Sequence, residues 1–226
     1  MPISGGAAPG LSIAEILTLW ETKRLNFFDE FNRAVEDTDV WTFGSDGGSF
    51  NDMALASEGT IWNLMTGGVI DNDAYIHGDG CTRNKYCTPF ELGYDTVTWE
   101  ARLRVAWATN QSAFYGLIDV PITDFAEPVS DCAHFLVDTT IGATFLARSH
   151  QAAEEQTDTG IALDGLFHRF KIIWSRTQVL FYIDDVLVAT HAAQVPTEPG
   201  TSELLARTEQ AVAQNTYIDY VRMEMS

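Results

Sequence analysis

The chain has 226 residues, of which 46% are hydrophobic and 12% aromatic, which is enough for one domain with a sizeable core. Its 32 acidic and 13 basic residues give a formal net charge of −19. This charge excludes nucleic-acid binding through phosphate neutralisation and argues against an anionic lipid surface. No apolar run approaches the length of a membrane span. We therefore expect neither nucleic acid nor membrane among the partners.

The first 24 residues form a separate unit in the sequence pattern. Residues 1–10 are rich in Gly, Ala and Pro and lack the charged start and apolar stretch of a secretory signal, so we expect no signal peptide. Ser12-Ile-Ala-Glu15 resembles a capping box. The apolar residues at helical spacing on one face are Ile13, Ile16, Leu17 and Trp20. We predict an arm with a short amphipathic helix over 1–24, which either packs on its own chain or docks on another subunit.

Thr96–Trp107 alternates between apolar and polar residues over its whole length. The apolar face carries Val97, Trp99, Ala101, Leu103, Val105 and Trp107. This period predicts a long strand with one buried side. The other face carries Glu100, Arg102 and Arg104, which we interpret as a salt-bridged network rather than a catalytic group.

The rest of the chain supplies many more short strand candidates. In chain order they are 25–32, 40–43, 52–56, 60–65, 113–120, 133–138, 143–148, 168–174, 179–183, 186–190, 202–208 and 216–225. Asp184-Asp185 reads as a two-residue hairpin turn. No strand–helix alternation appears, which argues against a parallel α/β fold. We predict an all-β protein whose residues 25–226 form a two-sheet antiparallel sandwich.

Three cysteines, Cys81, Cys87 and Cys132, argue against a full disulfide framework because their number is odd. Cys81 and Cys87 could form a disulfide across a short loop. The alternative is zinc, with His77, Cys81, Cys87 and either Cys132 or His134 as ligands, although the spacing matches no common finger. The sequence leaves both open.

Five segments in a fixed order carry a resemblance to a known family. They are Phe27-Phe-Asp-Glu-Phe-Asn32, Thr98-Trp-Glu-Ala-Arg-Leu-Arg104, Phe114-Tyr-Gly-Leu-Ile-Asp119, His168–Val188 and Tyr217-Ile-Asp-Tyr-Val-Arg222. Over about residues 26–225 the chain resembles a concanavalin A-like lectin/glucanase domain, similar to family 16 glycoside hydrolases and laminin-G-like modules. The resemblance implies a jelly-roll sandwich. Fold alone does not give function.

The hydrolase branch of that family carries Glu-x-Asp-x-x-Glu on one strand, where two carboxyls act as nucleophile and acid/base. No glutamate of this chain is followed two residues later by aspartate. The best-placed carboxylate, Asp119, has no partner glutamate on its strand. Motifs of the Gly-x-Ser-x-Gly, phosphate-loop and His-Glu-x-x-His types are also absent. We therefore predict that the protein is not an enzyme.

Two other roles follow from the resemblance. As glycan-binding candidates we take Glu100, Arg102, Arg104 and Tyr115. Relatives hold a structural Ca²⁺ with an aspartate of the closing strand, and Asp219 matches that position. The partner ligands would be backbone carbonyls near Asn32 and the Gly47–Ser49 turn. The alternative for Asp219 is hydrogen bonding to nearby backbone.

We predict a structural or attachment protein, a surface component of a tailed-phage virion (head decoration or fibre-associated), with glycan-binding ability. It would be made in the host cytoplasm and bind capsid or other virion subunits through the N-terminal arm, as an oligomer or part of a larger assembly. The alternative is a carbohydrate-binding lectin module with an extracellular location, and a family 16-like hydrolase ranks third.

Overall fold

The structure is a computed structural model, and it describes part of the chain. The described residues are 27–29, 41–46, 49–55, 59–65, 73–78, 93–105, 111–118, 131–197, 201–208 and 215–226. They contain strands and turns and no helix. Accordingly, no described helix is long and apolar enough to cross a membrane. The predicted arm and helix over 1–24 lie outside the described residues, as do Cys81 and Cys87.

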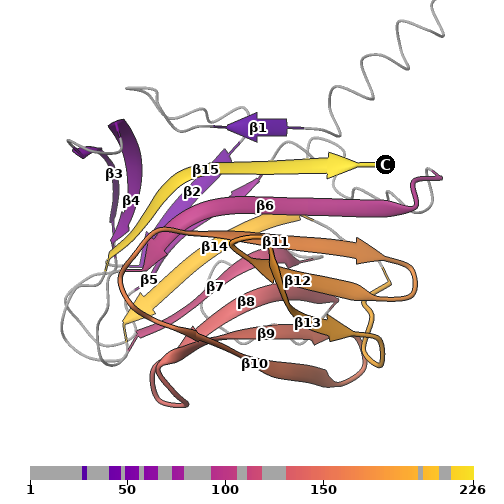
Figure 1. The fold of residues 1–226 in the computed structure, drawn as a ribbon. Helices are drawn as coiled ribbons and strands as arrows, with labels where there is room; N and C mark the ends of the chain where they lie inside the picture. The colour runs from indigo at the N-terminus through magenta and orange to yellow at the C-terminus, as the bar shows by residue number, and fades with distance from the viewer. Residues whose placement is uncertain are drawn as a thin grey trace, which may run out of the picture.

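The described strands form two antiparallel sheets, one behind the other in Figure 1. We name the first the β6 sheet. Its order is β13 (Val186–His191), β12 (Val179–Ile183), β11 (His168–Ser175), β6 (Thr96–Val105), β15 (Asn215–Met225), β4 (Gly59–Met65) and β3 (Ser49–Leu55), and β1 (Phe27–Asp29) also pairs with β15. We name the second the β8 sheet. Its order is β10 (Glu154–Ala162), β9 (Thr144–His150), β8 (Cys132–Asp138), β7 (Gln111–Ile118), β14 (Thr201–Thr208), β5 (Asp73–Gly78) and β2 (Trp41–Asp46).

The core lies between the two sheets and is built by the alternation seen in the sequence. The inward side chains of β6, such as Trp99, are fully buried. Phe135 of β8 meets rings of the opposite sheet edge to face, with centroids 5.0 Å from Phe170 and 5.4 Å from Phe181. Each buried aromatic ring of this kind contributes about 1.5–3 kcal/mol. The apolar faces that the sequence predicts are therefore what joins the sheets.

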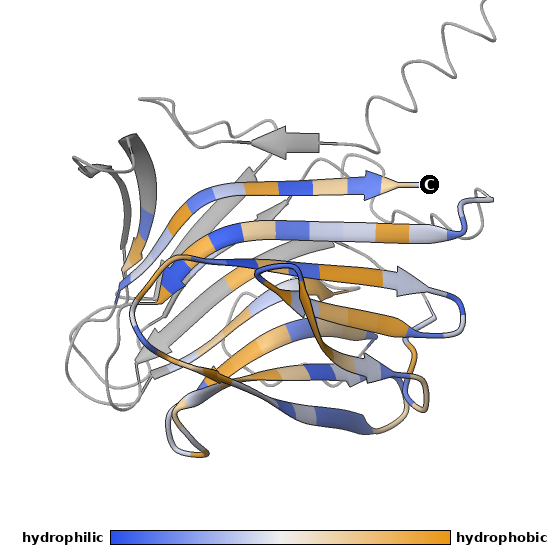
Figure 2. Ribbon diagram, in the orientation of Figure 1, coloured by the Kyte–Doolittle hydropathy of each residue, from blue (hydrophilic) through white to orange (hydrophobic). Residues whose placement is uncertain are grey.

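The antiparallel two-sheet prediction is confirmed, and the structure adds two strands that it missed. β5 and β10 were not predicted. β10 is an edge strand whose side chains are exposed or half-buried throughout, and Figure 2 shows it mostly in blue and pale colours. An edge strand needs no apolar face, so periodicity gives no signal for it. The predicted hairpin turn is also present: Asp184 and Asp185 have φ of 49° and 65°, as a type I′ turn requires.

Candidate functional site

The outward side chains of β11, β6 and β15 form a charged and aromatic surface, which we call the β6 outer face. Strand register arranges them in rows across the sheet. Glu100 lies opposite Lys171 on one side and Arg222 on the other. Arg102 lies opposite Arg169 and Tyr220, and Arg104 lies opposite Tyr217. Directly opposite side chains in a sheet are within contact distance.

Glu100 organises the first row. Its carboxylate is only 3% exposed and accepts hydrogen bonds from the Tyr220 hydroxyl at 2.7 Å and from Arg222 Nη2 at 3.0 Å. Lys171 Nζ lies 4.0 Å away. Burial raises the pKa of Tyr220, and the hydrogen bond and negative charge of Glu100 raise it further. Glu100 does lie in a salt-bridged network, but its partners are Arg222 and Lys171 rather than the predicted Arg102 and Arg104. This glutamate positions its neighbours rather than facing solvent.

The next rows alternate guanidinium groups and aromatic rings. Arg102 Nη1 forms an ion pair of 2.7 Å with Asp219 Oδ2, and its Cζ lies 4.5 Å from the ring centroid of Phe167. Arg104 Cζ lies 5.1 Å from the Phe167 centroid and 4.2 Å from that of Tyr217. Cation–π contacts of this type hold a guanidinium plane in place.

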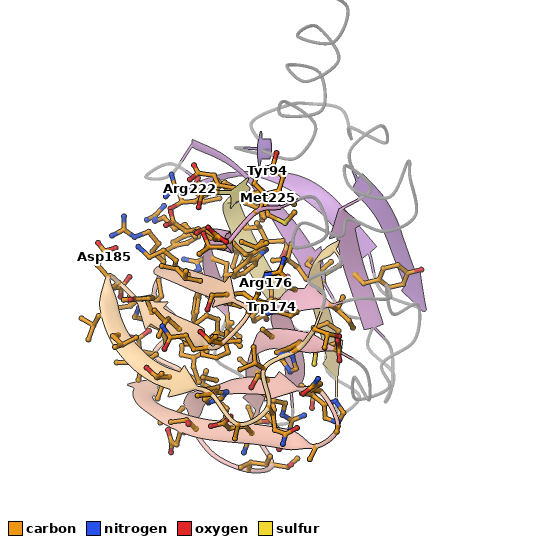
Figure 3. All side chains as sticks on the ribbon, turned by 90° about the vertical axis from the view of Figure 1, so that its right-hand side faces the viewer. Tyr94, Trp174, Arg176, Asp185, Arg222 and Met225 are labelled. Carbon is orange, nitrogen blue, oxygen red and sulfur yellow. The ribbon has the colours of Figure 1, made fainter. Side chains whose placement is uncertain are left out.

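The β12–β13 hairpin closes one side of this surface. Asp185 at its tip forms ion pairs with Arg169 and with Lys171, whose Nζ lies 3.2 Å from Asp185 Oδ1. Lys171 also lies 5.3 Å from the ring centroid of Tyr182. Figure 3 shows Asp185 and Arg222 on the same side of the molecule. The β6 outer face thus joins residues of four strands that are far apart in the sequence.

Two of the predicted site residues need correction or restriction. Tyr115 is wrong as a glycan platform: it is 0% exposed in the core, and its hydroxyl lies 2.9 Å from Thr216 Oγ1. Burial also raises its pKa. Asp219 forms its ion pair with Arg102, and the described residues contain no group of three or more His, Cys, Asp or Glu side chains that could hold a metal ion. Of the predicted carbonyl ligands, Asn32, Gly47 and Gly48 lie outside the described residues and only Ser49 is described, so calcium stays a prediction.

The outer side of β8, the strand next to β7, bears on the paired-carboxylate geometry, whereas Asp119 itself lies outside the described residues. The inward residues Ala133, Phe135 and Val137 belong to the core, which leaves Cys132, His134, Leu136 and Asp138 on the outer side. Asp138 Oδ1 accepts bonds from the Thr140 amide and hydroxyl and so caps a turn. A retaining hydrolase needs two carboxyls about 5–5.5 Å apart. No such pair occurs on β8.

His134 occupies the centre of that outer side in an unusual state. It is buried against Phe114, with ring centroids 5.4 Å apart, and neither ring nitrogen has a hydrogen-bond partner. Burial lowers its pKa to about 3, and the positive charges of Arg148 and His150 act in the same direction. Gly116 lies opposite in the register, and a Cβ there would lie 2.6 Å from His134 Cα. His134 is thus a neutral packed ring.

Sequence reasoning missed a serine–histidine contact at the edge of the sandwich. Ser149 Oγ lies 2.9 Å from His191 Nδ1, and Thr157 Oγ1 lies 3.0 Å from His191 Nε2. Both Ser149 and His191 are 0% exposed, and burial lowers the pKa of His191 although the charge of Glu155 opposes this. A catalytic serine must reach its substrate. This contact therefore links β9 and β10 of one sheet to β13 of the other.

Comparisons with known proteins agree with this architecture. Residues 137–218 match the sequence profile described as Glycosyl hydrolases family 16. The solved structure of apo Crh5 transglycosylase has a TM-score of 0.62 at 13% identity, covering 88% of this chain and 84% of that one. The structure of Bacillus licheniformis β-glucanase has a TM-score of 0.59 at 16% identity, and the match covers 88% of this chain and 97% of that one. No curated protein sequence matches the chain.

A phage protein also shares the fold. The conserved carbohydrate esterase from Shiga toxin-encoding bacteriophage phi24B has a TM-score of 0.56 at 15% identity, covering 90% of this chain and 98% of that one. Together the two sheets and these similarities define a concanavalin A-like jelly-roll protein. Within that class, the chain has the fold of glycosyl hydrolase family 16. At such identities the similarity establishes the fold, and the activity must be argued from the residues.

Proposed function

We propose that the protein is a non-catalytic attachment protein, a surface component of a tailed-phage virion that also binds glycans. The observation that carries the non-catalytic part is the outer side of β8, where Cys132, His134 and Leu136 are buried and His134 is uncharged. Glu100, the remaining catalytic candidate with described side-chain contacts, is held by Tyr220 and Arg222. A carboxylate so bound is a poor nucleophile or acid.

The experiment for this part is a turnover assay. Purified protein is incubated with β-glucans, galactans and alginates, and new reducing ends or unsaturated products are measured. We expect none above the signal of heat-denatured protein. Robust turnover that disappears in Glu100→Gln or Asp119→Asn would overturn the proposal.

The attachment part rests on the sequence of the arm and is supported by the shared fold of a protein from bacteriophage phi24B. A sandwich closes its core between its own sheets, so an apolar stripe outside it suits a partner. That stripe is Ile13, Ile16, Leu17 and Trp20. The partner would be a capsid or other virion subunit.

Deletion of residues 1–24 tests this attachment. We expect a folded protein with an unchanged melting temperature that no longer co-sediments with virions or sister subunits. Trp20→Ala should weaken co-sedimentation on its own, because a buried Trp is a frequent hot spot. Unfolding on truncation, or intact attachment, would assign the helix to the core instead.

The alternative, a lectin module, is favoured by the β6 outer face. Arg102, Arg104 and Tyr217 are half-buried there, and polar and aromatic side chains together suit sugar hydroxyls and ring faces. Glycan binding without any virion association would favour this function over attachment.

A further inference from the structure

One cation of the β6 outer face differs from the others. The chain carries 13 basic residues, and five of them lie on this face: Arg102, Arg104, Arg169, Lys171 and Arg222. Four have a carboxylate partner, namely Asp219, Asp185 or Glu100. Arg104 has none among the described side chains and contacts only the rings of Phe167 and Tyr217.

The surroundings of Arg104 favour an anion. Arg102 contacts the same Phe167 ring, so a second guanidinium lies nearby, its charge partly offset by Asp219. Among the described residues Arg104 lies beside another arginine and not beside an acid, so none of their carboxylates compensates its charge, although the chain has 32 acidic residues. Its guanidinium is already fixed by two rings, so binding a planar carboxylate through two parallel hydrogen bonds costs little additional side-chain entropy.

We propose that Arg104 binds the carboxylate of an acidic sugar, a uronic acid unit in a glycan chain. This proposal rests on the glycan-binding function and names the chemical class of its ligand. Tyr217, Tyr220 and Tyr182 lie on the same face, where rings and hydroxyl groups meet the apolar faces and hydroxyls of neighbouring sugars. Arg102 adds positive potential and stays paired with Asp219.

Nucleic acid is a poor ligand for this face, because too few of its described cations lack a carboxylate partner. A phosphate backbone needs several neutralising contacts in a row. The described part of this face offers one cation without a carboxylate partner, within a chain of net charge −19. One uronic acid unit at Arg104, with neighbouring sugars against the aromatic side chains, matches a face with one such cation and needs no row of neutralising contacts.

The experiment compares polygalacturonate with its methyl ester, which keeps the sugar backbone and removes the charge. Binding to full-length protein is measured by affinity electrophoresis and calorimetry. We expect Arg104→Gln to weaken polygalacturonate binding at least about tenfold, since a hydrogen-bonded charge pair is lost. Arg104→Lys should give an intermediate loss because the planar fork is missing. Arg176→Gln, in the exposed β11–β12 turn, is the control for net charge and should change binding less than about twofold.

Two results would overturn the proposal while leaving glycan binding intact: equal affinity for the acid and the methyl ester, or wild-type affinity in Arg104→Gln. A change in oligomeric state in Arg104→Gln without loss of polygalacturonate binding would assign the residue to contact with a second copy instead. Turnover of any polymer would contradict the non-catalytic function separately.

Discussion

Arg102 of β6 and Asp219 of β15 form a 2.7 Å ion pair at the point where the register between their strands shifts. The shift between Ile218 and Tyr220 leaves Asp219 as the extra residue of a bulge. The bulge therefore places two consecutive residues, Asp219 and Tyr220, on the outer face, where strict alternation allows only one of them. Both side chains are partly exposed, so the pair contributes at most about 1 kcal/mol.

This pair makes the calcium prediction testable through a competitor. A Ca²⁺ ion bound by Asp219 competes with Arg102 for the negative charge of this carboxylate. We expect millimolar Ca²⁺ to raise the melting temperature relative to EDTA by linkage, and to raise it more in Arg102→Ala, where the carboxylate is released. Differential scanning fluorimetry on both proteins measures this. If the melting curves with Ca²⁺ and with EDTA are identical for wild type and for Arg102→Ala, the prediction that the protein binds calcium is contradicted.

The ionisation of His168 makes the stability of the folded protein decrease as the pH rises. Its Nδ1 lies 2.6 Å from Asp184 Oδ2 and its Nε2 lies 3.0 Å from Asp164 Oδ1. Burial alone would lower the pKa of His168, but the two carboxylates outweigh it and raise the pKa above its ordinary value of 6.5. A raised pKa stabilises the folded state below pH 6.5, and this contribution is lost as the pH rises through the folded-state pKa.

We therefore expect the free energy of unfolding of wild type to fall relative to His168→Gln as the pH rises from 6.5 through the raised folded-state pKa. Urea unfolding at each pH measures it. Asp184→Asn should reduce the same pH-dependent difference, because it removes one of the two charges that raise the pKa. Parallel pH curves for wild type and His168→Gln would contradict this assignment.

The sequence predicted the sheets better than it predicted contacts between strands. Alternation over Thr96–Trp107 and the Asp184-Asp185 turn were enough for β6 and the β12–β13 hairpin. Arg102 and Arg104 seemed natural partners of Glu100 because they share its strand face. In fact residues two apart on a strand are roughly 6.6 Å apart, farther than residues directly across a strand pair. The partners of Glu100 are therefore Arg222 and Lys171, which only the register reveals.

Burial was the other property that sequence could not give. A tyrosine is a residue type that can stack on sugars, but the side chain of Tyr115 lies on the inward face of β7, in the core with Ala113 and Leu117. Phe114 points to the opposite side and joins a separate cluster with Leu136 and Leu146. In a strand that is buried on both sides, apolar residues occupy both faces, so periodicity does not say which face is the core.

His134→Leu tests the state of the buried ring on β8. Both ring nitrogens lack partners, and an unsatisfied buried polar group costs about 1–3 kcal/mol. We expect the variant to be as stable as wild type or more stable at neutral pH. The pKa of about 3 lies below the ordinary 6.5, so the histidine costs stability progressively as the pH falls from 6.5 towards 3.

His134→Leu should therefore also flatten the loss of stability in acid, which chemical denaturation at about pH 7 and about pH 4.5 measures. His150→Leu is a comparison variant with a smaller expected effect: His150 Nδ1 is also buried without a hydrogen-bond partner, and the positive charge of His150 is a smaller cause of the lowered pKa of His134. A strongly destabilised His134→Leu at neutral pH would indicate that the ring nitrogens do bind a group.

Gly116→Ala tests the close approach that His134 requires. A Cβ at Gly116 would lie 2.4 Å from the carbonyl oxygen of Ala133 and 2.6 Å from His134 Cα, and both are backbone atoms of β8 that cannot rotate away. The two strands would have to separate in the middle of the β8 sheet, which we expect to cost about 1–3 kcal/mol or more. Gly142→Ala is the matched control, because its nearest neighbour, Thr144 Oγ1, lies 3.8 Å from the added methyl group. Urea unfolding should show a clear loss of unfolding free energy for Gly116→Ala and little change for Gly142→Ala. Equal stability of the two variants would show that β7 and β8 are farther apart than this packing requires.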